Sequence, residues 1–248
     1  MLKGYILDKG EVHLKELEKL FPEVSSMTLR RDLDYLEEKG YILRIRGGAK
    51  SLNRLPGAQE DVFSQRAMEY TEAKMRIAQK ALGFIERGRS IFIDSGTTMM
   101  CLAKIIPDEN FSILTSGPNI GLEILKNNKP SVSLIGGQLS RNNLSTSGMI
   151  SIELIRKINI DIAFMATSGF SLESGFTIGD LNESNLKRAV IKKARKNILL
   201  MDVSKLDKNL PFTFAVLKDI DVLITDKEAG EIPEPLLRAA EKTGVQIL

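Results

Sequence analysis

The sequence predicts an α/β chain with two domains, a small N-terminal winged helix-turn-helix domain followed by a larger Rossmann-like α/β domain. Residues 1–54 hold two short amphipathic helices and then a basic strand, the order of elements in a winged helix-turn-helix. From about Thr71 onward, short apolar strands alternate with helices, which indicates a mainly parallel sheet covered on both faces. The 248 residues, 43% hydrophobic and 27% charged, suffice for a small domain beside a larger core.

The most informative segment is a short helix that carries two adjacent arginines on one face. Ser25 is a suitable N-cap and Gly40 a suitable terminating residue, so the helix should span about residues 26–39. Three leucines at positions i, i+4 and i+7 form one apolar stripe along it: Leu29, Leu33 and Leu36. Arg30 and Arg31 therefore lie on the opposite face, where they can enter the major groove of DNA.

A second helix and a basic strand flank this helix. Four apolar residues predict the upstream helix: Leu14, Leu17, Leu20 and Phe21. Pro22-Glu23-Val24 joins the two helices closely, as in a helix-turn-helix. Downstream, residues 41–46 alternate as a strand that turns at Gly47-Gly48. Residues 41–54 contain no acidic residue and form a basic wing beside the reading helix, with four cations: Arg44, Arg46, Lys50 and Arg54.

The placement of charge, rather than its total, supports DNA binding. Residues 1–54 contain 11 lysines and arginines against 9 acidic residues, and the whole chain has a net charge of only +3. An alternative is that Arg30 and Arg31 form a solvated helix face, paired with Asp34 three to four residues away and with Glu38 one turn beyond it. The cap, the turn and the basic wing together favour DNA binding over that alternative.

This region resembles a known family. The order Ser25-x-x-Thr28-Leu29-Arg30-Arg31-Asp32-Leu33, followed by Arg46-Gly47-Gly48-Ala49, resembles the winged helix-turn-helix of the DeoR family of bacterial transcriptional regulators. The resemblance implies that Thr28, Arg30 and Arg31 contact DNA while Asp32 orients or caps. The candidate DNA-binding residues are Ser25, Ser26, Met27, Thr28, Arg30, Arg31, Arg44, Arg46 and Lys50. The chain departs from the family in a shorter first helix and a turn that is one residue longer.

Composition excludes several other classes of protein. No apolar run approaches the roughly 20 residues that cross a bilayer, and the N-terminus lacks the apolar segment of a signal peptide. We therefore expect a cytoplasmic protein without a membrane partner. The single cysteine, Cys101, excludes an internal disulfide. His13 is the only histidine, so we expect no metal site, no cofactor and no histidine-based catalytic triad.

A Pro56-Gly57 pair in an aperiodic stretch indicates a connection between the domains. We predict a DNA-binding domain over residues 1–54, a linker over 55–71 and an effector-sensing and oligomerisation domain over 72–248. Strands of the larger domain are expected at residues 91–93, 111–114, 132–135, 160–165, 198–201 and 222–224. Helices are expected at residues 75–85, 99–106, 120–126, 150–158, 186–194 and 234–243.

Ligands of such a sheet bind at the carboxyl ends of its strands, and three of these ends carry small or polar residues. Asp94-Ser95-Gly96-Thr97-Thr98 ends a strand, turns on glycine and begins a helix, where unpaired amides and the helix dipole favour a phosphate. Thr115-Ser116-Gly117-Pro118-Asn119 and Gly136-Gly137 follow the next two strands, so the three turns should lie near one another. A structural alternative is that the hydroxyl groups only cap helices.

Further segments resemble the effector domain of the same family. They are Asp161-Ile162-Ala163-Phe164 with Gly169 and Gly175, Glu183-x-x-x-Lys187-Arg188, and Asp202-Val203-Ser204-Lys205. The resemblance implies that the larger domain is similar in fold to ribose-phosphate isomerases and that it senses a phosphorylated sugar. Lys187 and Lys205 would supply positive charge toward this ligand. The implied effector-binding residues are Asp94, Ser95, Gly96, Thr97, Thr98, Asn119, Gly136, Gly137, Glu183, Lys187 and Lys205. Ser116 and Ala166 stand where many relatives have asparagine and glycine.

Each of these lysines also has a plain alternative. Lys187 lies four residues after Glu183 and could pair with it along one helix, and Lys205 could be a solvated loop residue. The effector assignment therefore depends on where the fold places the two side chains.

We therefore predict a transcriptional regulator, a repressor of carbohydrate metabolism genes that binds a double-stranded DNA operator under the control of a phosphorylated sugar. The resemblance also implies a homo-oligomer. A ligand can change the affinity for DNA only by binding the competent and incompetent states unequally. One alternative is a sugar-phosphate isomerase with Asp94, Glu183 or Asp202 as the base, since such chemistry needs no histidine. Another is a constitutive DNA-binding protein whose larger domain only oligomerises.

Overall fold

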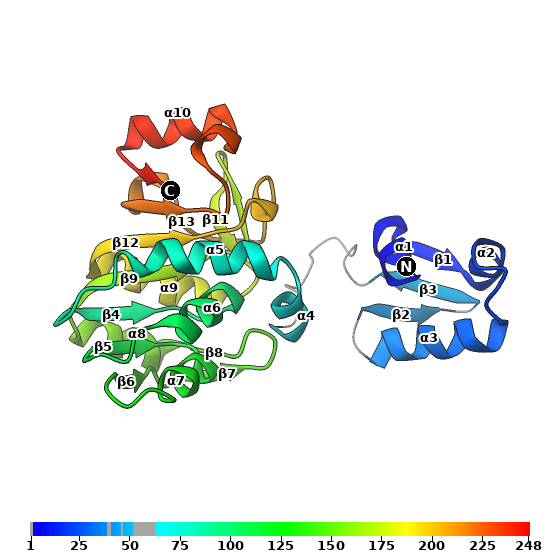
Figure 1. The fold of residues 1–248 in the computed structure, drawn as a ribbon, viewed down its shortest axis with the longest axis horizontal. Helices are drawn as coiled ribbons and strands as arrows, with labels where there is room; N and C mark the ends of the chain where they lie inside the picture. Colours follow the sequence, from blue (N-terminus) through cyan, green and yellow to red (C-terminus); the bar gives the residue numbers. More distant parts are fainter. Residues whose placement is uncertain (1, 39–40, 46, 52–62) are drawn as a thin grey trace. The chain divides into compact units, whose positions relative to one another are not determined.

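The computed structural model describes residues 2–38, 41–45, 47–51 and 63–248 (Figure 1). The chain divides into two compact units, Met1–Gln59 and Glu60–Leu248. Within the described ranges, every helix is too short or too polar to cross a bilayer.

The described part of the N-terminal unit consists of short helices and an antiparallel sheet. Its elements are α1 (Leu2–Lys9), β1 (Glu11–His13), α2 (Leu14–Leu20), α3 (Ser26–Glu38), β2 (Ile42–Ile45) and β3 (Gly48–Ser51). The sheet order is β1-β3-β2. The second and third helices and the wing lie where the sequence predicts them, whereas β1 has only three residues and gives no periodic signal. Gly48 allows β1 to approach, because a Cβ there would lie 2.1 Å from the Val12 carbonyl oxygen.

A sheet of seven parallel strands forms the centre of the larger unit, in the order β15-β14-β12-β9-β4-β5-β6. The strands are β4 (Ser90–Ile93), β5 (Ser112–Thr115), β6 (Ser131–Leu134), β9 (Ile160–Ala166), β12 (Ala194–Leu200), β14 (Val222–Ile224) and β15 (Gln246–Ile247). All six strands predicted from the sequence belong to this sheet, and each neighbouring pair is parallel. The predicted fold class is therefore confirmed.

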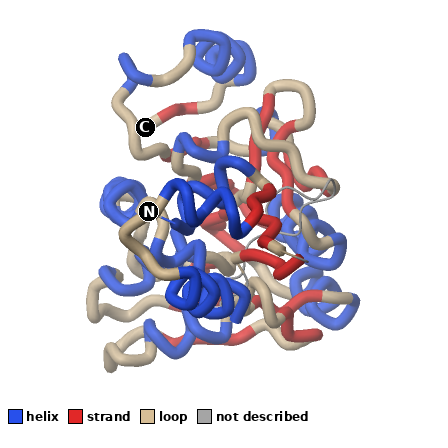
Figure 2. The backbone as a smooth tube through the Cα atoms, turned by 90° about the vertical axis from the view of Figure 1, so that its right-hand side faces the viewer, coloured by secondary structure: helices blue, strands red, loops and turns tan. Residues whose placement is uncertain are grey.

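Helices cover both faces of this sheet; Figure 2 draws helices in blue and strands in red. One face packs against α5 (Thr71–Leu82), α6 (Thr97–Ile105) and α7 (Pro118–Ile124). The other packs against α8 (Met149–Lys157), α9 (Leu181–Lys193) and α10 (Glu234–Thr243). Alternate residues of a strand serve the two cores: Ile91 and Ile93 face the first group of helices, and Phe92 faces the second. Burial on both faces explains why the central strands β4 and β9 are continuous apolar runs, whereas the edge strand β6 is mostly exposed.

Several short strands were not expected from the sequence. β10 (Gly169–Ser171), β11 (Gly175–Ile178) and β13 (Phe212–Ala215) form an antiparallel sheet, and β7 (Gln138–Ser140) pairs with β8 (Ser145–Ser147) in a hairpin. Each has three or four residues, which is too few to show an alternating pattern. These additions matter because they cover the turns at the carboxyl ends of the parallel strands.

A further helix, α4 (Phe63–Met68), lies within the range expected to be a linker. It contacts α6, and the Phe63 amide donates a hydrogen bond to the Asn142 carbonyl oxygen at 2.7 Å. This part of the expected linker over residues 55–71 is therefore packed against the larger unit, and a six-residue helix gives too little periodicity to be recognised in the sequence. The Pro56-Gly57 pair lies outside the described residues.

Candidate functional site

The helix α3 presents one face to solvent. Its three leucines are buried, whereas Arg30 and Arg31 are exposed and Met27 is 76% exposed. Neither arginine forms an ion pair or hydrogen bond with another residue whose side chain the structure describes. Asp34, one of the partners considered above, instead lies 3.7 Å from Arg44 Nε. The two guanidinium groups are therefore available for hydrogen bonds to phosphates or base edges.

Hydroxyl groups fix the first turn of α3. Ser25 Oγ accepts a hydrogen bond from the Thr28 amide at 3.2 Å, the cap predicted from the sequence. Ser26 Oγ donates to Glu18 Oε1 at 2.5 Å and so ties α3 to α2. The start of the helix is thereby held against its neighbour, while Ser25 and Ser26 remain exposed.

The wing is less basic in space than in the sequence. Arg44 on β2 lies near Asp34 of α3, and Lys50 Nζ on β3 lies 3.4 Å from Glu11 Oε2 on β1. Exposed pairs of this kind contribute only about 0–1 kcal/mol, so a phosphate can replace either carboxylate. Arg46 and Arg54, the other two predicted wing cations, lie outside the described residues.

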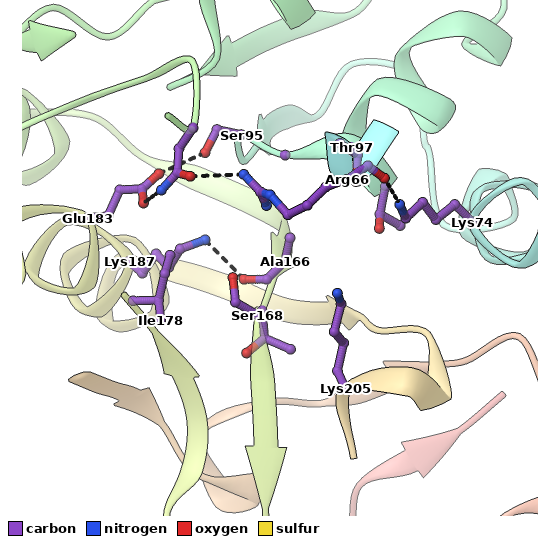
Figure 3. Close-up of a pocket in the computed structure, with 14 residues that line it drawn as sticks. Arg66, Lys74, Ser95, Thr97, Ala166, Ser168, Ile178, Glu183, Lys187 and Lys205 are labelled. Carbon is purple, nitrogen blue, oxygen red and sulfur yellow. Dashed lines mark hydrogen bonds between the residues drawn. The ribbon is translucent and has the colours of Figure 1, made fainter. Parts of the chain in front are cut away.

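A small pocket with an internal volume of about 30 Å³ lies at the carboxyl ends of the parallel strands of the larger unit (Figure 3). Predicted effector residues that line it are Ser95, Gly96, Thr97, Thr98, Glu183, Lys187 and Lys205. The remaining lining residues were not predicted: Arg66, Lys74, Asn143, Ala166, Thr167, Ser168 and Ile178.

The N-terminus of α6 opens into this pocket. Gly96 is its N-cap and has a φ of 115°, which glycine adopts without the strain that a side chain would cause. No side chain caps this helix, so the amides of its first turn, from Thr97 to Met99, have no partner within the helix. These amides and the positive end of the helix dipole favour an anion in the pocket.

Positive charge dominates the pocket lining. Its cationic side chains are Arg66, Lys74, Lys187 and Lys205, against one carboxylate, Glu183, among the described lining residues. Figure 3 shows the Lys205 side chain extending into the space between these groups. Its ammonium has no hydrogen bond or ion pair with another described residue, so it can serve a ligand without losing a protein partner.

Lys187 pairs with Asp94 rather than with Glu183. Both side chains of this ion pair are 3% exposed, and Lys187 Nζ also donates to the Ala166 carbonyl oxygen at 3.0 Å. Asp94 accepts hydrogen bonds from the amides of Ser95 at 2.9 Å and Ala166 at 3.0 Å. Asp94 therefore joins β4, β9 and α9 from behind the pocket and does not line it. The alternative pairing of Lys187 along its own helix is not observed.

A chain of hydrogen bonds crosses the pocket from α4 to the turn before α6. Arg66 Nη2 donates to Asn143 Oδ1 at 2.9 Å, and Asn143 Nδ2 donates to Glu183 Oε2 at 2.6 Å. Ser95 Oγ completes the chain by donating to Glu183 Oε1 at 3.1 Å. The Glu183 carboxylate is 3% exposed, and these donors stabilise its charge. The chain thus fixes one wall of the pocket.

Lys74 lies buried at another wall, with 3% of its surface exposed. Its ammonium donates to the carbonyl oxygens of Arg66 and, at 2.6 Å, of Glu69. Burial lowers the pKa of Lys74, an effect that the negative charge of Asp202 partly opposes. An anion in the pocket would stabilise the charged form of this lysine.

Besides Asp94, three further predicted effector residues do not belong to the pocket lining: Asn119, Gly136 and Gly137. The turns after β4, β5 and β6 are adjacent, as expected, but β8 passes over the second and third. The Thr146 amide of β8 donates to the Ser116 carbonyl oxygen at 2.7 Å, and a Cβ on Gly137 would lie 2.4 Å from the Ser147 carbonyl oxygen. The small residues of these turns therefore allow close packing of the hairpin.

Among the lining residues that were not predicted, Lys74 could have been identified from its position in the sequence. It lies one helical turn before Ile77 and Ala78 on the buried face of α5. A lysine on an apolar stripe needs a polar partner or a ligand, which marks it as a candidate. Arg66 and Asn143 lie in a short helix and a hairpin turn, for which the sequence gives no comparable pattern.

Within the described ranges, no group of three histidine, cysteine, aspartate or glutamate side chains could hold a metal ion.

Residues 1–54 match the family model of the DeoR-like helix-turn-helix domain, and residues 69–227 match that of the DeoR C terminal sensor domain. These two matches cover most of both units.

Individual relatives agree with these matches. The chain is 34% identical to the HTH-type transcriptional regulator IolR of Bacillus subtilis, over 91% of this chain and 89% of that protein. It is 31% identical to the HTH-type transcriptional repressor GlcR of the same organism, over 91% and 85% of the two chains. Ribose 5-phosphate isomerase A from Methanocaldococcus jannaschii is similar with a TM-score of 0.41 and 14% identity, over 55% of this chain and 54% of that one.

Proposed function

This chain belongs to the DeoR family of transcriptional regulators, and from that membership we propose that it is a repressor whose affinity for DNA changes when a phosphorylated sugar binds the larger unit. The observation that carries the proposal is the pocket at the N-terminus of α6. Amides without a partner within their helix, the positive end of that helix and the Lys205 ammonium, which has no partner among the described residues, converge there. Carbohydrate metabolism genes are the targets that such an effector suggests.

The phosphoryl group would occupy the part of the pocket next to Thr97 and Thr98, with Lys205 as its counter-ion. Charge-assisted hydrogen bonds of this kind are roughly twice as strong as neutral ones, so the site distinguishes the phosphorylated from the plain sugar. Glu183 and the Ser168 region provide acceptors and donors for sugar hydroxyl groups at the opposite wall. Lys187 and Asp94 would hold this arrangement in place.

On the DNA side, Arg30 and Arg31 would read base edges in the major groove, and Arg44 and Lys50 would contact phosphates. A symmetric homo-oligomer would place two copies of α3 on half-sites separated by about 34–36 Å, one turn of DNA. The name of GlcR, a transcriptional repressor, supports repression as the direction of control. A cytoplasmic location fits this role.

The isomerase alternative is less well supported. Asp94, the first of the candidate bases, is engaged by Lys187 and two amides, which suits a residue that organises the site. The relatives that cover most of the chain are transcriptional regulators.

Thermal unfolding of the purified protein with pentose and hexose phosphates, and with the same sugars unphosphorylated, tests the proposal. At about 100 times the dissociation constant, binding stabilises the protein by roughly 2.7 kcal/mol, a melting shift on the order of 5–10 °C. Thr97→Glu places a carboxylate at the proposed phosphoryl position and should remove the shift, because like charges repel there. The variant should still bind a DNA duplex selected from a random pool, but the sugar phosphate should no longer change its affinity for that duplex.

The outcome against the proposal is equally definite. If Thr97→Glu keeps the wild-type affinity for the same sugar phosphate, the ligand does not bind at α6. If plain and phosphorylated sugars shift the melting temperature equally, the effector class is wrong.

A further inference from the structure

Arg66 connects the pocket to the segment that leads to the DNA-binding unit. It belongs to α4, the first described element after residues 52–62, which join the two units. The two family models match residues 1–54 and 69–227, so Arg66 lies in neither. The residue nevertheless lines the pocket, and Figure 3 shows its side chain among the other lining residues.

Contacts with the pocket walls hold α4 along its length. At its start, the Phe63 amide donates to the Asn142 carbonyl oxygen at 2.7 Å. In its middle, Arg66 Nη2 donates to Asn143 Oδ1 at 2.9 Å. At its end, the ammonium of Lys74 donates hydrogen bonds to the carbonyl oxygens of Arg66 and Glu69. The position of α4 therefore depends on side chains that a ligand would contact.

An anionic ligand would compete with these contacts. The Asn143 acceptor is a neutral amide oxygen, whereas a phosphoryl group offers charged oxygens in a geometry that a guanidinium binds in a bidentate manner. Burial lowers the pKa of Lys74, which indicates that its charge is poorly solvated in the unliganded pocket. Both cations therefore have a reason to turn toward a phosphoryl group, and both are bonded to α4.

We propose that Arg66 is the residue that couples effector binding to DNA affinity, by exchanging its hydrogen bond with Asn143 for the phosphoryl group and shifting α4. The inference rests on the proposed function, because it needs a phosphorylated ligand in this pocket. The inference adds how the effect reaches the DNA: α4 follows directly after the segment that connects it to the DNA-binding unit. A shift of α4 would therefore change the affinity of that unit for DNA through the polypeptide that joins them. A ligand that bound without engaging Arg66 would have no such effect.

The test compares full-length wild-type protein with Arg66→Gln, Arg66→Lys and the control Arg141→Gln. Arg141 is exposed in the turn between β7 and β8, beside Asn142 and Asn143, and does not line the pocket. Calorimetry with a panel of sugar phosphates and with inorganic phosphate gives the affinities. Amide hydrogen exchange over residues 63–68 reports on α4, and release of a DNA duplex selected by the wild-type protein reports on coupling.

We expect Arg66→Gln to weaken sugar-phosphate binding by roughly 10- to 100-fold, the effect of losing a charge-assisted hydrogen bond. Even when saturated with ligand, this variant should show no change in exchange at α4 and no release of DNA. Arg66→Lys should recover part of the affinity, and Arg141→Gln should match the wild type. A wild-type melting temperature without ligand would show that the larger unit of the Arg66→Gln protein is folded.

Two results would overturn the inference: wild-type affinity in Arg66→Gln, or complete release of DNA by that variant once it is saturated. An exchange response of wild-type α4 to inorganic phosphate alone would support it, because the phosphoryl group would then suffice. Failure of the wild-type protein to bind any phosphorylated compound would instead reject the proposed function, so the two failures can be told apart.

Discussion

Replacing Lys187 with methionine should destabilise the larger unit, although the residue lines a binding pocket. Lys187 and Asp94 are each 3% exposed and form an ion pair, so the substitution leaves a buried carboxylate without its counter-ion. Removing one partner of a buried pair costs about 3–5 kcal/mol of the free energy of unfolding. Since about 1 kcal/mol corresponds to roughly 2–4 °C in a domain of this size, the melting temperature should fall on the order of 6–20 °C.

Lys205→Met provides the matched comparison, because it removes the same group from the same pocket. Lys205 is half-buried, and its ammonium has no hydrogen bond or ion pair with another described residue. Its replacement should therefore change the free energy of unfolding by no more than about 0.5 kcal/mol. Its effect should appear in the affinity for a sugar phosphate, which should fall by roughly 10- to 100-fold.

Urea unfolding and calorimetry of the two variants measure both quantities. The double variant Asp94→Asn with Lys187→Met removes both charges and should recover part of the stability lost in the single variant. A Lys187→Met protein with the wild-type urea midpoint would refute the assignment of a buried, structural ion pair. A Lys205→Met protein with undiminished affinity would remove this lysine from the ligand site.

Three further predictions concern DNA and pH. Arg30→Ala or Arg31→Ala should lower discrimination between specific and random duplexes by about 1–3 kcal/mol at matched salt, and equal specificity in both variants would exclude α3 as the reading helix. Lys50→Ala should make the slope of log affinity against log salt shallower by about 0.9 without loss of stability, and an unchanged slope would mean that the wing does not touch phosphates. Because burial lowers the pKa of Lys74 and a bound anion raises it again, binding takes up a proton above the lowered pKa. Calorimetry should therefore show sugar-phosphate affinity decreasing as the pH rises through that lowered pKa, and affinity that stays constant up to pH about 10 would contradict this linkage.

The fold of the larger unit could be predicted because its central strands are buried on both faces. Apolar runs such as residues 91–93 and 198–201 are strong signals that depend only on local sequence. The hairpin of β7 and β8 has strands of three residues, Gln-Leu-Ser and Ser-Thr-Ser, which carry no such pattern. Its position over the turns after β5 and β6 depends on tertiary packing, which the local sequence does not indicate. For that reason Gly136 and Gly137 were assigned to the ligand site although they do not line the pocket.

The part of the candidate site that lies at one strand end could be predicted from the sequence. The part that depends on contacts between side chains far apart in the sequence could not. The turn from Ser95 to Thr98 lies at the end of a buried strand, so its place at the carboxyl edge of the sheet follows from the sequence. Arg66 lies 77 residues from its partner Asn143, and no local spacing could have brought the two together. Helix α3 shows the same limit: its exposed arginines were predictable, but the ion pair of Asp34 with Arg44 on β2 was not.

These pairings determine which residues can be used to test the function. Asp94 and Lys187 belong to segments that resemble the family's effector domain, yet both are buried and bonded to the backbone of neighbouring elements, so their replacement changes folding and binding together. Thr97 and Lys205 reach the same pocket without supporting another element through a described ion pair. A loss of ligand response in variants of these two residues can therefore be assigned to the pocket, whereas the same loss at Asp94 would have two explanations.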